Sequence, residues 1–286
     1  MVANGIGEAV DAVVRAYGRR LVDRQPELER VLLRLRDAYA RGHVAARVAA
    51  NGLRYDAPIR PYRLLTVDPD DVERVREFSS PKFRHAGLVV SGDWDQTAAC
   101  FEDMDVYRAY ERHFENGVPW AETDFYDRII ADIEAGREQW GCTTRADFER
   151  RCEQLDALYE TIAEEGYKTQ AELAAGEAVD PLASQDTLKT ERFKHEISVH
   201  VARDGELLFD DGRNRLSIVK LHGLDAVPVR VLRRHADWQA TRDAYVRGDP
   251  AVEHLGDHPD VAALEFGSVG SGGPLRRRTG RVARRL

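Results

Sequence analysis

The chain has 286 residues, of which 43% are hydrophobic and 32% are charged, so it is long enough for about two domains and too apolar to be disordered throughout. No apolar run approaches the roughly 20 residues that span a bilayer, and the start of the chain lacks the pattern of a secretory signal. Its three cysteines form no CxxC pair, which disfavours a disulfide framework or a zinc cage. We therefore expect a soluble, cytoplasmic protein with a formal net charge of −8.

Residues 1–57 are predicted to form an N-terminal helical hairpin. Apolar side chains recur every three or four residues on each side of Pro26, while charged residues occupy the other positions. This spacing is typical of two amphipathic helices that pack together or bind a partner. The apolar positions are Ile6, Val10, Val13, Tyr17, Leu21, Leu28, Val31, Leu32 and Leu35.

Residues 58–95 are predicted to begin a sheet, with strands at 62–67 and 88–90. Between them, Asp68 followed by Pro69 is typical of a helix N-cap with proline at the first helical position. The pattern predicts a short helix that ends near residue 79, and its apolar positions are Val72 and Val75.

Residues 96–189 are predicted to be a helical insertion. The segment holds 22 acidic and 9 basic residues, a net charge of −13, so it would repel a nucleic-acid backbone. Glycines at 117, 136 and 166 stand where helices are expected to end. The clearest helical stripe consists of Phe148, Cys152, Leu155, Leu158 and Ile162.

Residues 190–245 change from helical to alternating patterns. Residues 196–203 and 206–209 read as two strands joined by Asp204–Gly205, a strong hairpin signal. A glycine turn then leads into a predicted helix at 216–223, and a further strand is predicted at 227–232. Beyond it, Arg233, Arg234 and His235 followed by Trp238 are compatible with an extended anion site that has an aromatic ring for base stacking. The favoured alternative is that Trp238 is a core anchor and that the arginines are solvated. Residues 246–286 are predicted to be a flexible tail with a basic end that holds six arginines.

The turn between residues 209 and 216 is the most informative segment for function. A strand that enters a helix through a glycine leaves the first helical amides without internal partners, and the helix dipole adds partial positive charge there. Two arginines beside such amides suit a phosphate or another anion, while an aspartate could cap the helix or orient an arginine or a magnesium ion. The candidate binding residues are Asp210, Asp211, Gly212, Arg213, Asn214 and Arg215. No metal ligands are assigned, because His195 and His200 lie five residues apart on opposite faces of a strand.

The segment from Glu196 to His235 resembles the ParB N-terminal domain of the ParB/sulfiredoxin superfamily. The features that carry the resemblance are the hairpin, the Gly212-x-x-Arg215 turn and the helix and strand that follow; residues 62–69 resemble the first strand and helix of the same domain. The resemblance implies an α+β fold with a small mixed sheet, built from residues 58–95 and 190–245 around the helical insertion. It also implies that the turn binds the phosphates of a nucleotide such as CTP, ATP or ADP with magnesium.

The turn also departs from two branches of that superfamily. Sulfiredoxins carry a cysteine within the turn, where this chain has Arg213 and Asn214, so sulfinic acid reduction is disfavoured. Chromosome-partition members have consecutive arginines there and a helix-turn-helix domain after the ParB-like core, whereas this chain has Asn214 and a tail of about 40 residues after that core. The leading interpretation is a protein that binds a nucleotide or a phosphorylated small molecule, with hydrolysis or phosphoryl transfer left open. The alternatives are a non-catalytic interaction protein with a protein partner, and a DNA-associated regulator that uses the arginine-rich tail.

Overall fold

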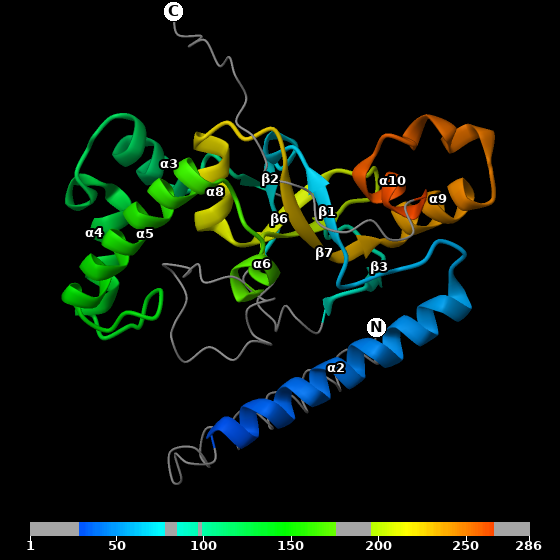
Figure 1. The fold of residues 1–286 in the computed structure, drawn as a ribbon, viewed down its shortest axis with the longest axis horizontal. Helices are drawn as coiled ribbons and strands as arrows, with labels where there is room; N and C mark the ends of the chain where they lie inside the picture. The colour runs from blue at the N-terminus through cyan, green and yellow to red at the C-terminus, as the bar shows by residue number, and fades with distance from the viewer. Residues whose placement is uncertain (1–28, 78–84, 97–98, 176–195, 266–286) are drawn as a thin grey trace, which may run out of the picture.

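The chain folds as an α+β protein in which a mixed sheet carries helices at both ends (Figure 1). This computed structural model describes residues 29–77, 85–96, 99–175 and 196–265. The α+β class with a helical insertion, expected from the sequence, is confirmed. The first helix of the predicted N-terminal hairpin and the arginine-rich tail lie outside the described residues.

The described strands form one sheet in the order β1-β7-β5-β6-β2-β4, with β3 pairing to β7. The β5–β7, β3–β7 and β2–β6 pairs are parallel, whereas β1–β7, β5–β6 and β2–β4 are antiparallel. The strands are β1 Leu64–Val67, β2 Arg74–Val75, β3 Leu88–Val90, β4 Ala99–Cys100, β5 Ser198–Val201, β6 Leu207–Asp211 and β7 Val227–His235.

The hairpin between β5 and β6 confirms the strongest local signal in the sequence. Gly205 has φ +98°, a conformation that costs other residues free energy, and a Cβ there would lie 2.8 Å from the Trp238 ring. The Ala202 amide donates to the Glu206 carbonyl at 2.9 Å and closes the turn. Trp238 is almost fully buried, so it is the core anchor that its sequence position predicted.

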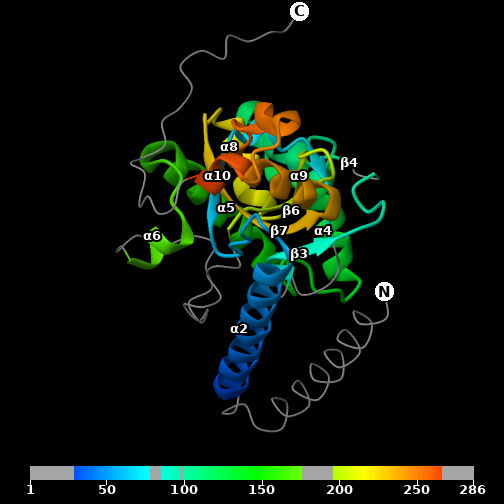
Figure 2. The same cartoon turned by 90° about the vertical axis from the view of Figure 1, so that its right-hand side faces the viewer.

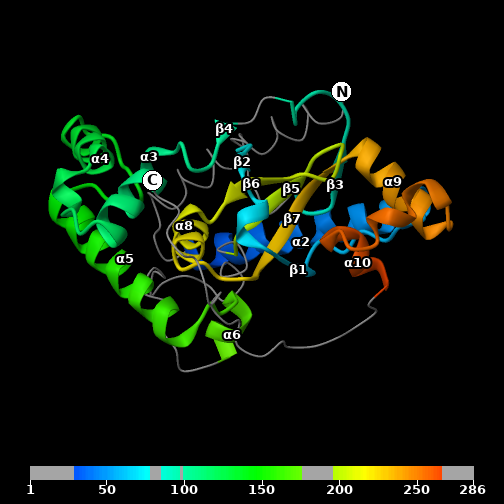
Figure 3. The ribbon, with the colours of Figure 1, turned by 90° about the horizontal axis from the view of Figure 1, so that it is seen from above.

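Helices pack on one face of the sheet and at its ends. Figures 1 and 3 place α8 between the sheet and the helices of the insertion. The core joins sheet residues such as Val199 and Phe209 to Leu216 of α8 and Leu155 of α5. The α-helices are α2 Glu29–Arg54, α3 Asp105–Tyr110, α4 Asp124–Glu134, α5 Arg145–Glu165, α6 Gln170–Ala175, α8 Arg213–Leu221, α9 Ala236–Val246 and α10 Pro259–Glu265. Shorter elements are the 3-10 helices η2 Pro69–Asp71, η5 Trp120–Glu122 and η7 Pro250–Leu255, and the π-helix η4 Glu111–Glu115.

The insertion follows its sequence pattern closely in α5. Thr144 and Asp147 form a capping box at the start of this helix, and the glycine at 166 ends it with φ +76°. The predicted apolar stripe of α5 is buried at all five positions: Phe148, Cys152, Leu155, Leu158 and Ile162.

Two segments differ from their sequence predictions. After Asp68 caps it, the predicted helix lasts for the single 3-10 turn η2, because Arg74 and Val75 pair instead with β6 and β4. Residues 250–265, predicted as part of the flexible tail, form η7 and α10, and Val261 is buried in the core. The prediction of a flexible tail is therefore wrong for the residues up to Glu265.

The long helix α2 is attached mainly through its C-terminal half. Val44 is fully buried, and the Arg47 and Asn51 side chains donate to the carbonyls of Ala86 and Gly87 just before β3. Figure 2 shows the rest of α2 projecting away from the other described elements. In the described part of the chain, no helix combines the length and the apolar character needed to cross a bilayer.

Candidate functional site

The predicted phosphate-binding turn lies where β6 ends and α8 begins. Gly212 is the N-cap of α8 and has φ +91°. A Cβ at this position would lie 2.9 Å from the Ile197 Cα, so the neighbouring backbone leaves room only for glycine. The structure thus places the six predicted residues at the end of β6 and in the first turn of α8.

The first amides of α8 are open. No side chain caps the helix, and within the described residues no acceptor is found for the amides of Arg213 and Asn214. The Gly212 amide donates to Oδ1 of the preceding Asp211 at 2.9 Å. In addition, the Asn214 Oδ1 is buried without a hydrogen-bond partner among the described residues. The turn therefore offers unsatisfied backbone donors at the positive end of a helix dipole.

The two arginines of the turn have different surroundings. Arg213 is partly exposed, and its Nη2 donates to Glu77 Oε1 at 2.5 Å. Arg215 is 7% exposed and acts electrostatically on the buried carboxylate of Glu196. Burial raises the pKa of Glu196, while the Gln170 amide and the charges of Arg215 and Arg230 oppose that rise. Arg213 can turn toward a ligand, whereas Arg215 is a buried positive charge in the first turn of α8.

Asp210 lies on a β-bulge and contacts His200. In the register, Ser198 pairs with Asp211 and Val199 with Phe209, so Asp210 is the extra residue of β6. Its Oδ1 lies 3.2 Å from the His200 Nε2, and both side chains are 1% exposed. Asp210 is therefore directed into the protein, and it does not face solvent at the turn.

A second register shift occurs between β5 and its other neighbour, β7. Here Val199 pairs with Val231 and His200 with Arg233, which leaves Leu232 as the extra residue of β7. Bulges are found more often than average next to functional sites, where they redirect side chains. The two bulges thus lie on either side of Val199 along β5, next to His200.

Buried polar side chains cover the face of the sheet that is opposite the apolar core. Arg233 Nη2 lies 2.7 Å from the His85 Nδ1, and burial together with the Arg233 charge lowers the pKa of His85 to about 3. Arg230 Nη2 donates to the Ser198 hydroxyl at 3.3 Å. We call this set the polar sheet face, and it consists of His85, Ser198, His200, Asp210, Arg230 and Arg233. All of these except His85 lie on strands, and these five residues are at most 8% exposed.

Sequence reasoning missed the polar sheet face. It considered His200 only as half of a metal pair with His195, which lies outside the described residues, and it predicted that Arg233 is solvated. The sequence did carry a signal for it: polar residues alternate with valines in β5 and in the first part of β7. In the described ranges, no three histidine, cysteine, aspartate or glutamate side chains come together in an arrangement that could hold a metal ion.

Comparisons with protein-family models, with curated proteins and with solved structures find no match to this chain. The resemblance to the ParB/sulfiredoxin superfamily accordingly stays a prediction that depends on the Gly212-x-x-Arg215 turn and the elements around it.

Proposed function

We propose that this protein binds a nucleotide, or another phosphorylated small molecule, at the start of α8. The open amides of Arg213 and Asn214 beside two arginines are the observation that carries the proposal. Backbone N–H groups at a helix start and arginine guanidinium groups are the donors that phosphate oxygens prefer in proteins. The proposal agrees with the superfamily resemblance of this turn.

Each group has a stated part in this proposal. The phosphate accepts hydrogen bonds from the two open amides, and Arg213 exchanges Glu77 for a phosphate oxygen. Arg215, which is 7% exposed, contributes positive charge from the first turn of α8. Asp211 orients the Gly212 amide, and a magnesium ion, where one is needed, arrives bound to the nucleotide phosphates.

Thermal unfolding with CTP, ATP, ADP and GTP, with and without magnesium, tests the proposal. A ligand at 100 times its Kd adds about 2.7 kcal/mol, or about 5–10 °C in Tm for a chain of this size. We expect at least one nucleotide to produce such a shift, and Arg213→Gln to weaken it at least tenfold in apparent Kd while changing the unliganded Tm little.

Arg112→Gln is the matched control, because Arg112 is an exposed arginine of η4, outside the turn. Its nucleotide response should equal that of the unsubstituted protein. A response that is the same in the Arg213 and Arg112 variants, or no response to any nucleotide, contradicts the proposal. Phosphate release measured in the same samples decides whether binding leads to hydrolysis.

A second candidate function, self-association through α2, is favoured by the exposed apolar face of this helix. Val31, Leu35 and Tyr39 follow one another at four-residue spacing and are 49%, 61% and 55% exposed. Further along the helix, a Cβ at Gly42 would meet nothing within 4 Å, so another helix could approach closely there. The face is thus suited to packing against the same helix of a second copy.

Sedimentation of the full chain tests this candidate. We expect a dimer that dissociates at least tenfold more readily on Leu35→Glu. Val246→Glu should leave association unchanged, because Val246, 46% exposed, is also an exposed apolar residue but lies on α9. A monomeric unsubstituted chain would rule out self-association through α2.

A further inference from the structure

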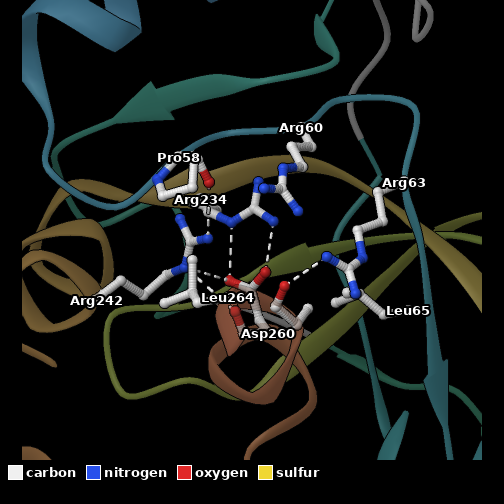
Figure 4. Close-up of a pocket in the computed structure, with 9 residues that line it drawn as sticks. Pro58, Arg60, Arg63, Leu65, Arg234, Arg242, Asp260 and Leu264 are labelled. Carbon is white, nitrogen blue, oxygen red and sulfur yellow. Dashed lines mark hydrogen bonds and ion pairs between the residues drawn. The ribbon is translucent and has the colours of Figure 1, made fainter. Parts of the chain in front are cut away.

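A second concentration of positive charge lies at the opposite end of β7 from the candidate turn. Figure 4 shows a pocket between the segment before β1, the end of β7, and the helices α9 and α10. Its enclosed space is small, about 20 Å³, and it opens to solvent. Among the described residues that line it, four are arginines and Asp260 is the only acidic one. The four are Arg60, Arg63, Arg234 and Arg242.

Two of these arginines share a single buried carboxylate. Arg234 donates through Nε to the Asp260 Oδ2 at 2.8 Å and through Nη2 to the Asp260 Oδ1 at 2.5 Å. The Arg242 Nε lies 3.2 Å from the Asp260 Oδ2. The exposed fractions of Arg234, Arg242 and Asp260 are 4%, 2% and 1%. Asp260 is the carboxylate in contact with both guanidinium groups, and Asp243 also acts electrostatically on Arg242. The two buried positive charges are therefore only partly balanced where water cannot solvate them well.

In the described part of the chain, Arg234 also has an unsatisfied donor. Its Nη1 is buried and has no hydrogen-bond partner among the described residues. A buried donor left in this state costs about 1–3 kcal/mol, so it marks a position where a ligand acceptor is favoured. Figure 4 shows the Arg60 guanidinium beside that of Arg234, on the side away from Asp260.

We propose that this pocket binds a small oxyanion, a phosphate or carboxylate group, between Arg60 and Arg234. The anion accepts a hydrogen bond from Arg234 Nη1, is paired by the exposed Arg60 and lies near Arg63, which donates to the Ala263 carbonyl at 2.5 Å. It neutralises the excess charge of the buried pair, and it fixes α10 against β1 and β7 because Asp260 belongs to α10.

This pocket is distinct from the turn at Gly212. Arg230, which contacts Ser198 near the turn, lies four residues before Arg234 on β7, a separation of about 13 Å along the strand. Substitutions at the two places therefore report on different sites, and the pocket does not depend on nucleotide binding.

The test is thermal unfolding of the full chain in a titration with potassium phosphate or potassium acetate, with potassium chloride keeping ionic strength constant. We expect one or both oxyanions to raise Tm beyond chloride, and the anion that acts identifies the group bound. Arg60→Gln, at an exposed position, should weaken the apparent affinity at least tenfold. Arg234→Lys keeps a positive charge near Asp260 but removes the unsatisfied N–H, so it should weaken binding as well.

Arg112→Gln is the control, and it should respond to the oxyanion as the unsubstituted chain does. The pocket proposal is overturned if neither oxyanion acts beyond chloride, or if the response survives Arg60→Gln. A response that is lost in the Arg213 variant and kept in the Arg60 variant places the anion at the turn; that outcome rejects the pocket and supports the proposed function.

Discussion

Asp260→Ala is expected to lower the free energy of unfolding by about 3–5 kcal/mol, because it leaves two buried guanidinium groups without their shared carboxylate. The same carboxylate accepts a hydrogen bond from the Trp238 indole at 3.0 Å, so its loss also affects the residue that anchors α9 to the core. Chemical denaturation at neutral pH measures the change as a shift of the midpoint.

Glu134→Ala is the matched control, since Glu134 also pairs with an arginine, Arg145 at 2.7 Å, but both side chains are more than half exposed. An exposed pair of this kind contributes about 0–1 kcal/mol. A loss for Asp260→Ala no larger than for Glu134→Ala would show that the buried pair contributes little.

The same carboxylate predicts a pH dependence with a definite sign. Although burial alone would raise the pKa of Asp260, the charges of Arg234 and Arg242 lower it to about 2, below the ordinary value of 3.8. A carboxyl whose pKa is lower in the folded state contributes stability above its unfolded pKa, and that contribution is lost as pH falls toward 2. We expect this acid-dependent loss to be smaller in Asp260→Asn than in the unsubstituted chain, which unfolding curves between pH 5 and pH 2 would measure.

Gly212→Ala is expected to destabilise the fold by about 2–5 kcal/mol. The left-handed conformation costs alanine about 1–2 kcal/mol, and a Cβ only 2.9 Å from the Ile197 Cα adds about 1–3 kcal/mol of overpacking against backbone that cannot move aside. The measurement is the midpoint of chemical denaturation, and the same variant should also lose nucleotide binding.

Gly136→Ala separates the two contributions. Gly136 has φ +77°, close to that of Gly212, but a Cβ there meets nothing within 4 Å. Its substitution should therefore cost only the conformational part. Equal losses for the two alanine variants would show that the approach of Ile197 to Gly212 does not constrain the turn.

The parts of the fold that were predictable from sequence depend on short-range signals. Asp204–Gly205 predicted the hairpin, and residues 88–90 form β3 as predicted. In α5, the Thr144 start and the three- and four-residue spacing predicted both the helix and its buried face. Each of these signals acts within a few residues, so no knowledge of distant contacts was needed.

The parts that were missed depend on partners far away in the chain. Arg234 was expected to be solvated, but its carboxylate partner is Asp260, 26 residues later, in a segment that composition assigned to the tail. In the same way, Arg74 and Val75 leave the predicted helix because β6, more than 130 residues later, supplies a parallel partner. Propensity is a weak determinant where tertiary pairing of this kind is available.

The candidate site combines both situations. The glycine turn and its arginines were identifiable from the local order of strand, glycine and helix. The Glu77 partner of Arg213 and the Glu196 environment of Arg215 were not, because they come from other segments. The polar sheet face becomes visible only when β5, β6 and β7 are aligned with their two bulges.

The most direct measurement of the central claim is an amide-resolved NMR titration of the full chain with CTP and ATP in the presence of magnesium. We expect the largest chemical-shift changes to fall on the backbone amides of Arg213 and Asn214, and Arg213→Gln to reduce them. A nucleotide that saturates the protein while these two amides stay unperturbed would contradict it.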